Sequence, residues 1–110
     1  PQVQASNGTP ELATQKREAK IVNKYGLHAR PAMMFVELAN RYSSSIEVSN
    51  GQLAVDAKSI MSVMRLAAVQ GTTLIITADG EDADVAVSDL VKLVDDGFGE
   101  MEAPDESVSI

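Results

Sequence analysis

The chain has 110 residues, a net charge of −7 and no cysteine. This length suits one domain with a sizeable core, and the lack of cysteine excludes disulfides, thiol catalysis and cysteine-based metal sites. The negative charge argues against a nucleic-acid binder, and no apolar run is long enough to cross a bilayer. We therefore expect a cytoplasmic protein that neither binds nucleic acid nor inserts into a membrane.

The two ends of the sequence differ in composition from its middle. Residues 1–17 are mostly small and polar without a sustained period, which predicts a flexible N-terminal extension. Residues 100–110 carry several acids and no base, which predicts a disordered acidic tail. One domain is therefore expected in residues 18–99.

The first predicted elements are a strand over residues 19–23 and a helix over residues 29–41, separated by a turn at Tyr25-Gly26. Proline is tolerated in the first turn of a helix, so Pro31 places the helix start just before it. Apolar residues recur at helical spacing and are expected to face the core. They are Ala32, Val36 and Ala39, with Phe35 beside them.

A β-hairpin is predicted next. Residues 45–49 alternate between polar and apolar side chains, as a half-buried strand does. Asn50-Gly51 is a strong hairpin signal, since both residues accept the positive φ angles of a type I′ turn. Residues 52–56 are the expected return strand.

A second helix is predicted over residues 59–68, with Ser59 as its N-cap and Gly71 beyond its end. A β-rich run at residues 72–78 predicts the fourth strand. The core-facing positions expected in this helix are Val63, Leu66 and Ala67.

The third and longest helix is predicted over residues 82–96, with acids in its first turn and Gly97 at its end. Its apolar stripe consists of Ala83, Val87, Leu90 and Val94. The complete order is β-α-β-β-α-β-α. Four such strands form one sheet with the helices on a single face, so the fold class is α+β.

The single histidine, His28, lies directly before the first predicted helix. The backbone amides at a helix start, here those of Ala29 and Arg30, form a natural anion site. A neutral imidazole there has a free ring nitrogen, which is a nucleophile, and Arg30 can offer a charge-assisted hydrogen bond to phosphoryl oxygens. Gly26 allows the backbone to fold tightly around the ring. We therefore expect a phosphoryl group at His28, although a lone histidine is more often structural.

No second histidine, cysteine or carboxylate cluster accompanies His28 to complete a metal site or an acid–base pair. We therefore expect no metal and no cofactor. The pattern favours a carrier of a group over a hydrolase.

The second predicted helix carries more apolar residues than one core-facing stripe requires. Ile60, Met61 and Met64 would then form a patch turned toward solvent, and methionines suit surfaces that accept several partners. Met33 and Met34 enlarge the apolar rim beside the histidine. The alternative for the patch is that this helix is deeply buried on more than one side. The separate alternative for Ser59 is that it is only an N-cap.

Two separated segments carry a family resemblance. Gly26-Leu27-His28-Ala29-Arg30-Pro31-Ala32 and Lys58-Ser59-Ile60-Met61-Ser62-Val63-Met64 resemble HPr, the histidine-containing phosphocarrier family of the bacterial phosphoenolpyruvate-dependent sugar phosphotransferase system. The resemblance extends to the hairpin, to Gly71 and to the ending Gly97-Phe98-Gly99. It implies an open-faced β-sandwich with an antiparallel sheet in the order 1-4-2-3.

The resemblance also implies a function. His28 would accept a phosphoryl group on Nδ1 from phosphorylated Enzyme I and pass it to enzyme IIA domains of sugar transporters, with Arg30 steadying the group. Ser59 matches a regulatory serine that HPr kinase/phosphorylase modifies, and Ile60, Met61 and Met64 match the patch that docks partners. The protein would act as a monomeric, stoichiometric carrier and not as an enzyme.

Three alternatives stay open at this point. The chain could be a regulatory adaptor whose Ser59-phosphorylated form binds a transcription regulator. It could serve the nitrogen-linked branch of the phosphotransferase system, where the final acceptor is regulatory. It could also be an inert domain that retains the fold, which would leave the combination of His28, Arg30 and the methionines to coincidence.

Overall fold

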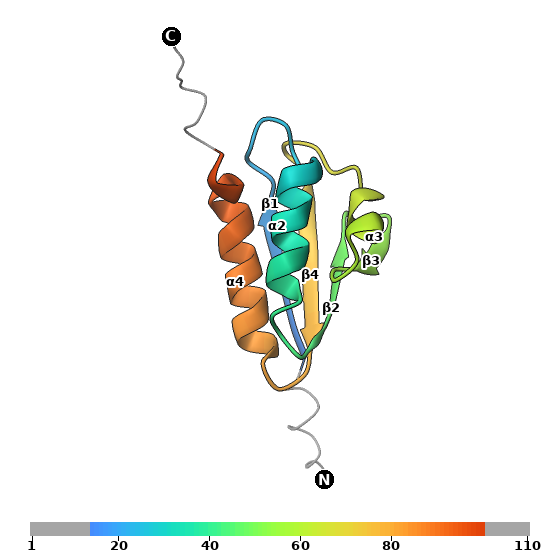
Figure 1. Cartoon of the computed structure of the whole chain (residues 1–110), viewed down its shortest axis with the longest axis vertical. Helices are drawn as coiled ribbons and strands as arrows, with labels where there is room; N and C mark the ends of the chain where they lie inside the picture. Colours follow the sequence, from blue (N-terminus) through green and yellow to red (C-terminus); the bar gives the residue numbers. More distant parts are fainter. Residues whose placement is uncertain (1–13, 101–110) are drawn as a thin grey trace.

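The structure is a computed structural model and describes residues 14–100 (Figure 1). The four strands form one antiparallel sheet in the order β1-β4-β2-β3, so the predicted α+β class, element order and strand order are confirmed. The elements are β1 (Thr14–Lys20), α2 (Ala29–Ala39), β2 (Ser45–Ser49), β3 (Ala54–Asp56), α3 (Ile60–Met64), β4 (Thr73–Asp79), α4 (Ala83–Asp95) and the 3-10 turn η1 (Gly97–Gly99).

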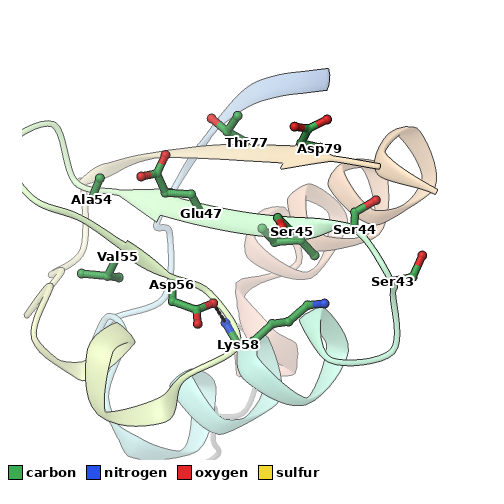
Figure 2. A pocket seen from close by; sticks show the side chains of 11 residues that line it. Ser43, Ser44, Ser45, Glu47, Ala54, Val55, Asp56, Lys58, Thr77 and Asp79 are labelled. Atoms are coloured by element: carbon green, nitrogen blue, oxygen red, sulfur yellow. Dashed lines mark hydrogen bonds between the residues drawn. The ribbon is translucent and has the colours of Figure 1, made fainter. Parts of the chain in front are cut away.

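The helices cover one side of the sheet and leave the other side open (Figures 1 and 2). The core lies between these two layers. Successive strand residues point to opposite faces, so every second residue of β2 and β4 is buried. The stripe predicted for α4 is buried in full, whereas in α2 Phe35 is buried and Val36 only half-buried. The main core residues are Ala32, Phe35, Ala39, Ile46, Val48, Leu74, Ile76, Ala78, Ala83, Val87, Leu90 and Val94.

The first strand lies earlier in the chain than the sequence predicted. β1 spans Thr14–Lys20 and pairs with β4 from Thr14↔Asp79 to Lys20↔Thr73, so residues 14–17 belong to the domain and not to a flexible extension. Of its side chains only Ala19 is buried, so no apolar alternation marks it. Residues 14–20 therefore form a strand because their backbone pairs with β4 and not because of an apolar pattern. The rest of the predicted extension, residues 1–13, lies outside the described residues.

The hairpin is confirmed, but its predicted type I′ turn is wrong. Strand pairing ends at Ser49↔Ala54, so residues 50–53 form a four-residue connection. The Asn50 side chain accepts hydrogen bonds from the backbone amides of Gln52 and Leu53, both at 2.9 Å. An asparagine side chain that imitates a turn carbonyl therefore closes this loop, and Gly51 alone has a positive φ angle there.

The second helix is shorter than predicted. α3 ends at Met64, and the amides of Arg65, Leu66 and Ala67 bond to carbonyls only three residues back. Val63 and Leu66 are buried as predicted, but Ala67 is exposed and has a φ angle of 47°. The chain leaves the helix here through a left-handed residue, which aims Ala68 into the core and Ala67 at solvent.

Two acids attach α4 to the loop that follows α2. The Asp82 carboxylate accepts hydrogen bonds from the Ser44 hydroxyl and from the backbone amides of Ser43 and Ser44, which lowers its pKa to about 2. The Tyr42 hydroxyl donates to the Asp89 carboxylate, and this bond raises the pKa of Tyr42. The acidic helix start therefore binds a neighbouring loop rather than its own amides.

Candidate functional site

The loop before α2 packs closely on the loop that follows α3, and both lie at the same end of the molecule (Figure 1). The Leu27 amide donates to the Ala68 carbonyl at 2.9 Å. Gly26 has a φ angle of 66°, and a Cβ atom there would lie 2.5 Å from the Ala68 carbonyl oxygen and 2.8 Å from Val69 Cα. Only glycine fits this conformation and this approach, so Gly26 sets the path of the chain into His28.

His28 is the N-cap residue of α2, as the position of Pro31 predicted. Its backbone is extended, with φ −75° and ψ −174°, and its carbonyl accepts from the Ala32 amide at 2.9 Å. Its side chain forms no capping hydrogen bond and is 41% exposed. The ring is therefore available to a partner beside the first-turn amides of Ala29 and Arg30, which have no acceptor within the helix.

Arg30 lies on the exposed first turn of α2. Its guanidinium forms no hydrogen bond or ion pair with another residue of the described range 14–100. The structure therefore places Arg30 two residues from His28 on the same helix start, but shows no contact between their side chains. The predicted convergence of the two groups stays a prediction for the phosphorylated state.

Glu100 is a site residue that the sequence reasoning missed, since it assigned this residue to the disordered tail. Its carboxylate lies 3.0 Å (Oε2) and 3.2 Å (Oε1) from His28 Nε2. Asn23, which is 1% exposed, donates from Nδ2 to Glu100 Oε1 at 3.0 Å and to the Gly26 carbonyl at 2.8 Å. Residues 101–110 of the predicted tail lie outside the described residues.

The turn after α4 brings Glu100 to His28. Gly97 ends the helix with a φ angle of 65°, as predicted, and Phe98 follows at 56° with its side chain buried. These consecutive left-handed residues reverse the chain toward the start of α2. The Gly97-Phe98-Gly99 sequence was the available signal for this reversal, but a contact over 72 positions cannot be read from local pattern.

Ser59 is the N-cap of α3, and its hydroxyl accepts from the Ser62 amide at 3.3 Å. The side chain is half-buried, and the residue lies immediately before the exposed Ile60 and Met61. The capping role that the sequence offered as an alternative is thus present. It does not exclude modification of the same hydroxyl.

Large apolar side chains are exposed on α3 and on segments near it. Met61 is 78% exposed, and Ile60 and Met64 are exposed as well, so these side chains face solvent as predicted and the alternative of an α3 buried on several sides is wrong. A docking role for them stays a prediction. Met33 contributes from α2, which contacts α3. Sequence reasoning missed Tyr25 and Val69, which are exposed in the two loops that meet at Gly26. We call these six residues the apolar patch: Tyr25, Met33, Ile60, Met61, Met64 and Val69.

A concavity lies elsewhere in the described part of the chain. It measures about 560 Å³ and lies where β2, β3 and β4 meet the loop after α2, with polar side chains such as Glu47, Asp56 and Thr77 in its lining (Figure 2). Lys58 points toward this loop and donates to the Tyr42 carbonyl at 2.7 Å. His28 is not among the lining residues, so this concavity is separate from the histidine.

The arrangement of His28, the helix start and the apolar patch defines a small α+β protein with a surface histidine suited to carrying a group. A family profile described as "PTS HPr component phosphorylation site" matches residues 15–96. The chain therefore belongs to the HPr family of phosphocarrier proteins of the phosphotransferase system, and the resemblance drawn from the two motifs is confirmed.

Individual relatives agree with this assignment. The chain is 48% identical to phosphocarrier protein HPr of Pseudomonas aeruginosa over 86 residues, which cover 77% of this chain and 96% of that protein. It is 42% identical to the HPr of Cupriavidus necator, covering 79% of this chain and 98% of that protein. The crystal structure of HPr-C-His from Thermoanaerobacter tengcongensis matches with a TM-score of 0.75 at 43% identity, over 78% of this chain and 97% of that one.

Residues 14–100 contain neither a group of side chains placed to hold a metal ion nor a helix able to span a membrane. No group of three or more potential ligands among His, Cys, Asp and Glu is placed to hold a metal ion in this range. None of the helices described there combines the length and hydrophobicity that a bilayer span needs.

Proposed function

We propose that this chain relays a phosphoryl group through His28, accepting it from phosphorylated Enzyme I and donating it to enzyme IIA domains of sugar transporters. The observation that carries this proposal is the exposed His28 ring at the start of α2, free of any capping role, inside the segment that matches the family profile. In this role the chain is a stoichiometric, monomeric carrier in the cytoplasm and needs no cofactor.

The transfer step needs few protein groups. A lone pair of a His28 ring nitrogen forms the new N–P bond while the bond between phosphorus and the donor's histidine nitrogen breaks. The transferred oxygens meet the first-turn amides of α2 and its positive helix end, which favour negative charge. The Arg30 guanidinium, exposed on the same turn, adds a charge-assisted hydrogen bond.

The apolar patch supplies what the histidine lacks, a surface that brings large partners to it. Exposed apolar groups that gather on one face mark a protein-binding site, and flexible methionines adapt to partners of different shape. Met33, Ile60, Met61 and Met64 are the docking residues that we propose, with Tyr25 and Val69 extending the same surface.

We propose Ser59 as the site at which an HPr kinase/phosphorylase regulates docking. A phosphate there adds about two negative charges beside Ile60 and Met61, where a partner has to bury apolar surface. Among residues 14–100, the half-buried hydroxyl accepts one hydrogen bond, from the Ser62 amide at 3.3 Å, so phosphorylation disturbs little of the helix.

A regulatory function is the second candidate. The chain is also similar to Crh, the catabolite repression HPr of Bacillus subtilis, with a TM-score of 0.57 and 39% identity over 73% of this chain and 95% of that one. In this role the Ser59-phosphorylated chain binds a transcription regulator, or a phosphoryl group passes to a regulatory acceptor of the nitrogen branch, with little sugar-transport flux.

A pulse–chase experiment separates these functions. The full chain is labelled with Enzyme I and phosphoenolpyruvate and then mixed with enzyme IIA domains of a sugar transporter or with a nitrogen-branch acceptor. The relay predicts rapid loss of label to the sugar-transporter domain. Transfer only to the nitrogen-branch acceptor, or no transfer from a labelled chain, would contradict the sugar relay and favour the regulatory function.

A further inference from the structure

We infer that Glu100 and Asn23 are positioning residues that hold the His28 ring in its Nε2–H tautomer and so leave Nδ1 as the reacting nitrogen. This inference rests on the proposed phosphocarrier function. The contacts that carry it are the two short distances from Glu100 to His28 Nε2 and the bond from the buried Asn23 amide to the same carboxylate.

The chemistry of the carboxylate decides which ring nitrogen carries the proton. An ionised carboxylate has acceptors only, so a hydrogen bond at 3.0 Å from Glu100 Oε2 requires that His28 Nε2 donates. In a neutral imidazole the other nitrogen then has no proton and carries the free lone pair. A hydrogen-bond acceptor at one ring nitrogen in this way fixes the proton there and leaves the other nitrogen free to react or to bind, as in metal-bound and catalytic histidines.

Asn23 holds the carboxylate in place. The residue is almost fully buried, and its Nδ2 donates to Glu100 Oε1 at 3.0 Å and to the Gly26 carbonyl at 2.8 Å. Both of these partners are acceptors, so the NH₂ group of the Asn23 side chain has to face them. The Asn23 amide is therefore oriented with Nδ2 toward Glu100 and Oδ1 away from it. Oδ1 is buried and accepts no hydrogen bond from the described residues, which argues that this orientation is kept for the sake of Glu100 and the loop.

The fixed tautomer simplifies phosphoryl transfer. When the Nδ1 lone pair forms the N–P bond and the donor's P–N bond breaks, the ring becomes a phosphorylated imidazolium and keeps its Nε2 proton. No proton has to leave or enter the ring in either direction of transfer. The Glu100 carboxylate stabilises the positive charge that develops on the ring, through a hydrogen bond that strengthens as the charge grows.

The test uses two-bond ¹⁵N–¹H correlation spectra of the full, unphosphorylated chain at alkaline pH. His28 is the only histidine, so its two ring-nitrogen shifts report the tautomer directly. The wild type is expected to show Nε2 protonated and Nδ1 free. Glu100→Ala is expected to bring the shifts closer together through tautomer averaging, and to slow labelling by Enzyme I about tenfold, the effect of losing one charge-assisted hydrogen bond. Asp95→Asn, which removes an exposed acid at the end of α4, should change neither.

Glu100→Gln gives a sharper result. Asn23 still donates to the amide oxygen of the introduced side chain, which turns its NH₂ group toward the ring. An NH₂ group only donates, so Nε2 has to accept and the proton moves to Nδ1. The variant is therefore expected to invert the tautomer. Adding Asn23→Ala should release the amide and restore the Nε2–H form, while Glu100→Gln alone already decides the question if the double variant does not fold.

The outcomes separate the positioning inference from the phosphocarrier function. Normal labelling of the wild type, with the same tautomer in all Glu100 variants, would overturn the positioning inference and leave the carrier function intact. Absence of label on the wild type would overturn the carrier function, and with it the purpose of the tautomer lock, whatever the spectra show. Amide spectra of each variant verify that the fold is retained.

Discussion

Gly26→Ala is the substitution that tests most sharply how the path into His28 is built. A Cβ atom at residue 26 would lie 2.5 Å from the Ala68 carbonyl oxygen and 2.8 Å from Val69 Cα, both of them backbone atoms that cannot rotate away. The left-handed φ angle of 66° costs an alanine about 1–2 kcal/mol, and the overpacking adds about 1–3 kcal/mol. The loss of unfolded-state freedom returns about 0.4–1 kcal/mol. We therefore expect a net loss of about 2–4 kcal/mol in the free energy of unfolding.

Urea denaturation measures this loss, and the chain provides a matched control. Gly71 also has a left-handed backbone, with φ 94°, but a Cβ atom there would meet nothing within 4 Å. Gly71→Ala therefore carries the conformational cost without the clash and should lose only about 1 kcal/mol. Labelling of His28 by Enzyme I should slow in the first variant only, since its loop has to move. Equal losses in both variants would refute the close approach at Gly26.

Three further changes test other parts of the structure. Ala67→Gly should stabilise the protein by about 0.5–1 kcal/mol in thermal melts. The substitution relieves a left-handed alanine that costs about 1–2 kcal/mol, and the greater freedom of glycine in the unfolded state offsets about 0.5–1 kcal/mol of this gain. The control Ala68→Gly, at a buried position, should destabilise the protein in the same melts. Asp82→Asn should lower stability near neutral pH, and its difference in stability from the wild type should shrink between about pH 4 and pH 2. A carboxyl whose folded-state pKa is lowered to about 2 stabilises the fold at pH values above its ordinary pKa and loses that contribution as it is protonated. A stability difference that stays constant over this pH range contradicts the assignment. Ser59→Asp should raise the concentration of Enzyme I needed for half-maximal labelling while α3 stays folded, and equal labelling kinetics in both forms would remove the proposed brake.

Sequence pattern captured the elements whose own residues specify them. The apolar stripe of α4 and the alternation in β2 were visible locally, because each follows the period of its secondary structure, and Gly97 and the β-rich composition of β4 marked the helix end and the fourth strand. The position of His28 before Pro31 likewise located the candidate site, and the excess of apolar residues in the second predicted helix indicated the exposed side chains of Ile60, Met61 and Met64.

The elements that pattern missed are decided by partners distant in the sequence. β1 is charged along most of its length and becomes a strand because β4 offers it a paired edge. Ala67 adopts a left-handed angle that its own residue type disfavours, since the chain has to deliver Ala68 to the core and to the Leu27 amide. Glu100 reaches His28 through tertiary contacts alone, and only its place after the glycine-flanked Phe98 hinted at a turn.

One labelling experiment tests the central claim most directly. The full chain and its His28→Ala variant are incubated with Enzyme I and phosphoenolpyruvate, and the phosphate is located by mass spectrometry under conditions that preserve phosphohistidine. The proposed relay predicts one acid-labile phosphate on His28 of the wild type and none on the variant. A wild type that stays unlabelled, or a variant that is labelled equally, would contradict it.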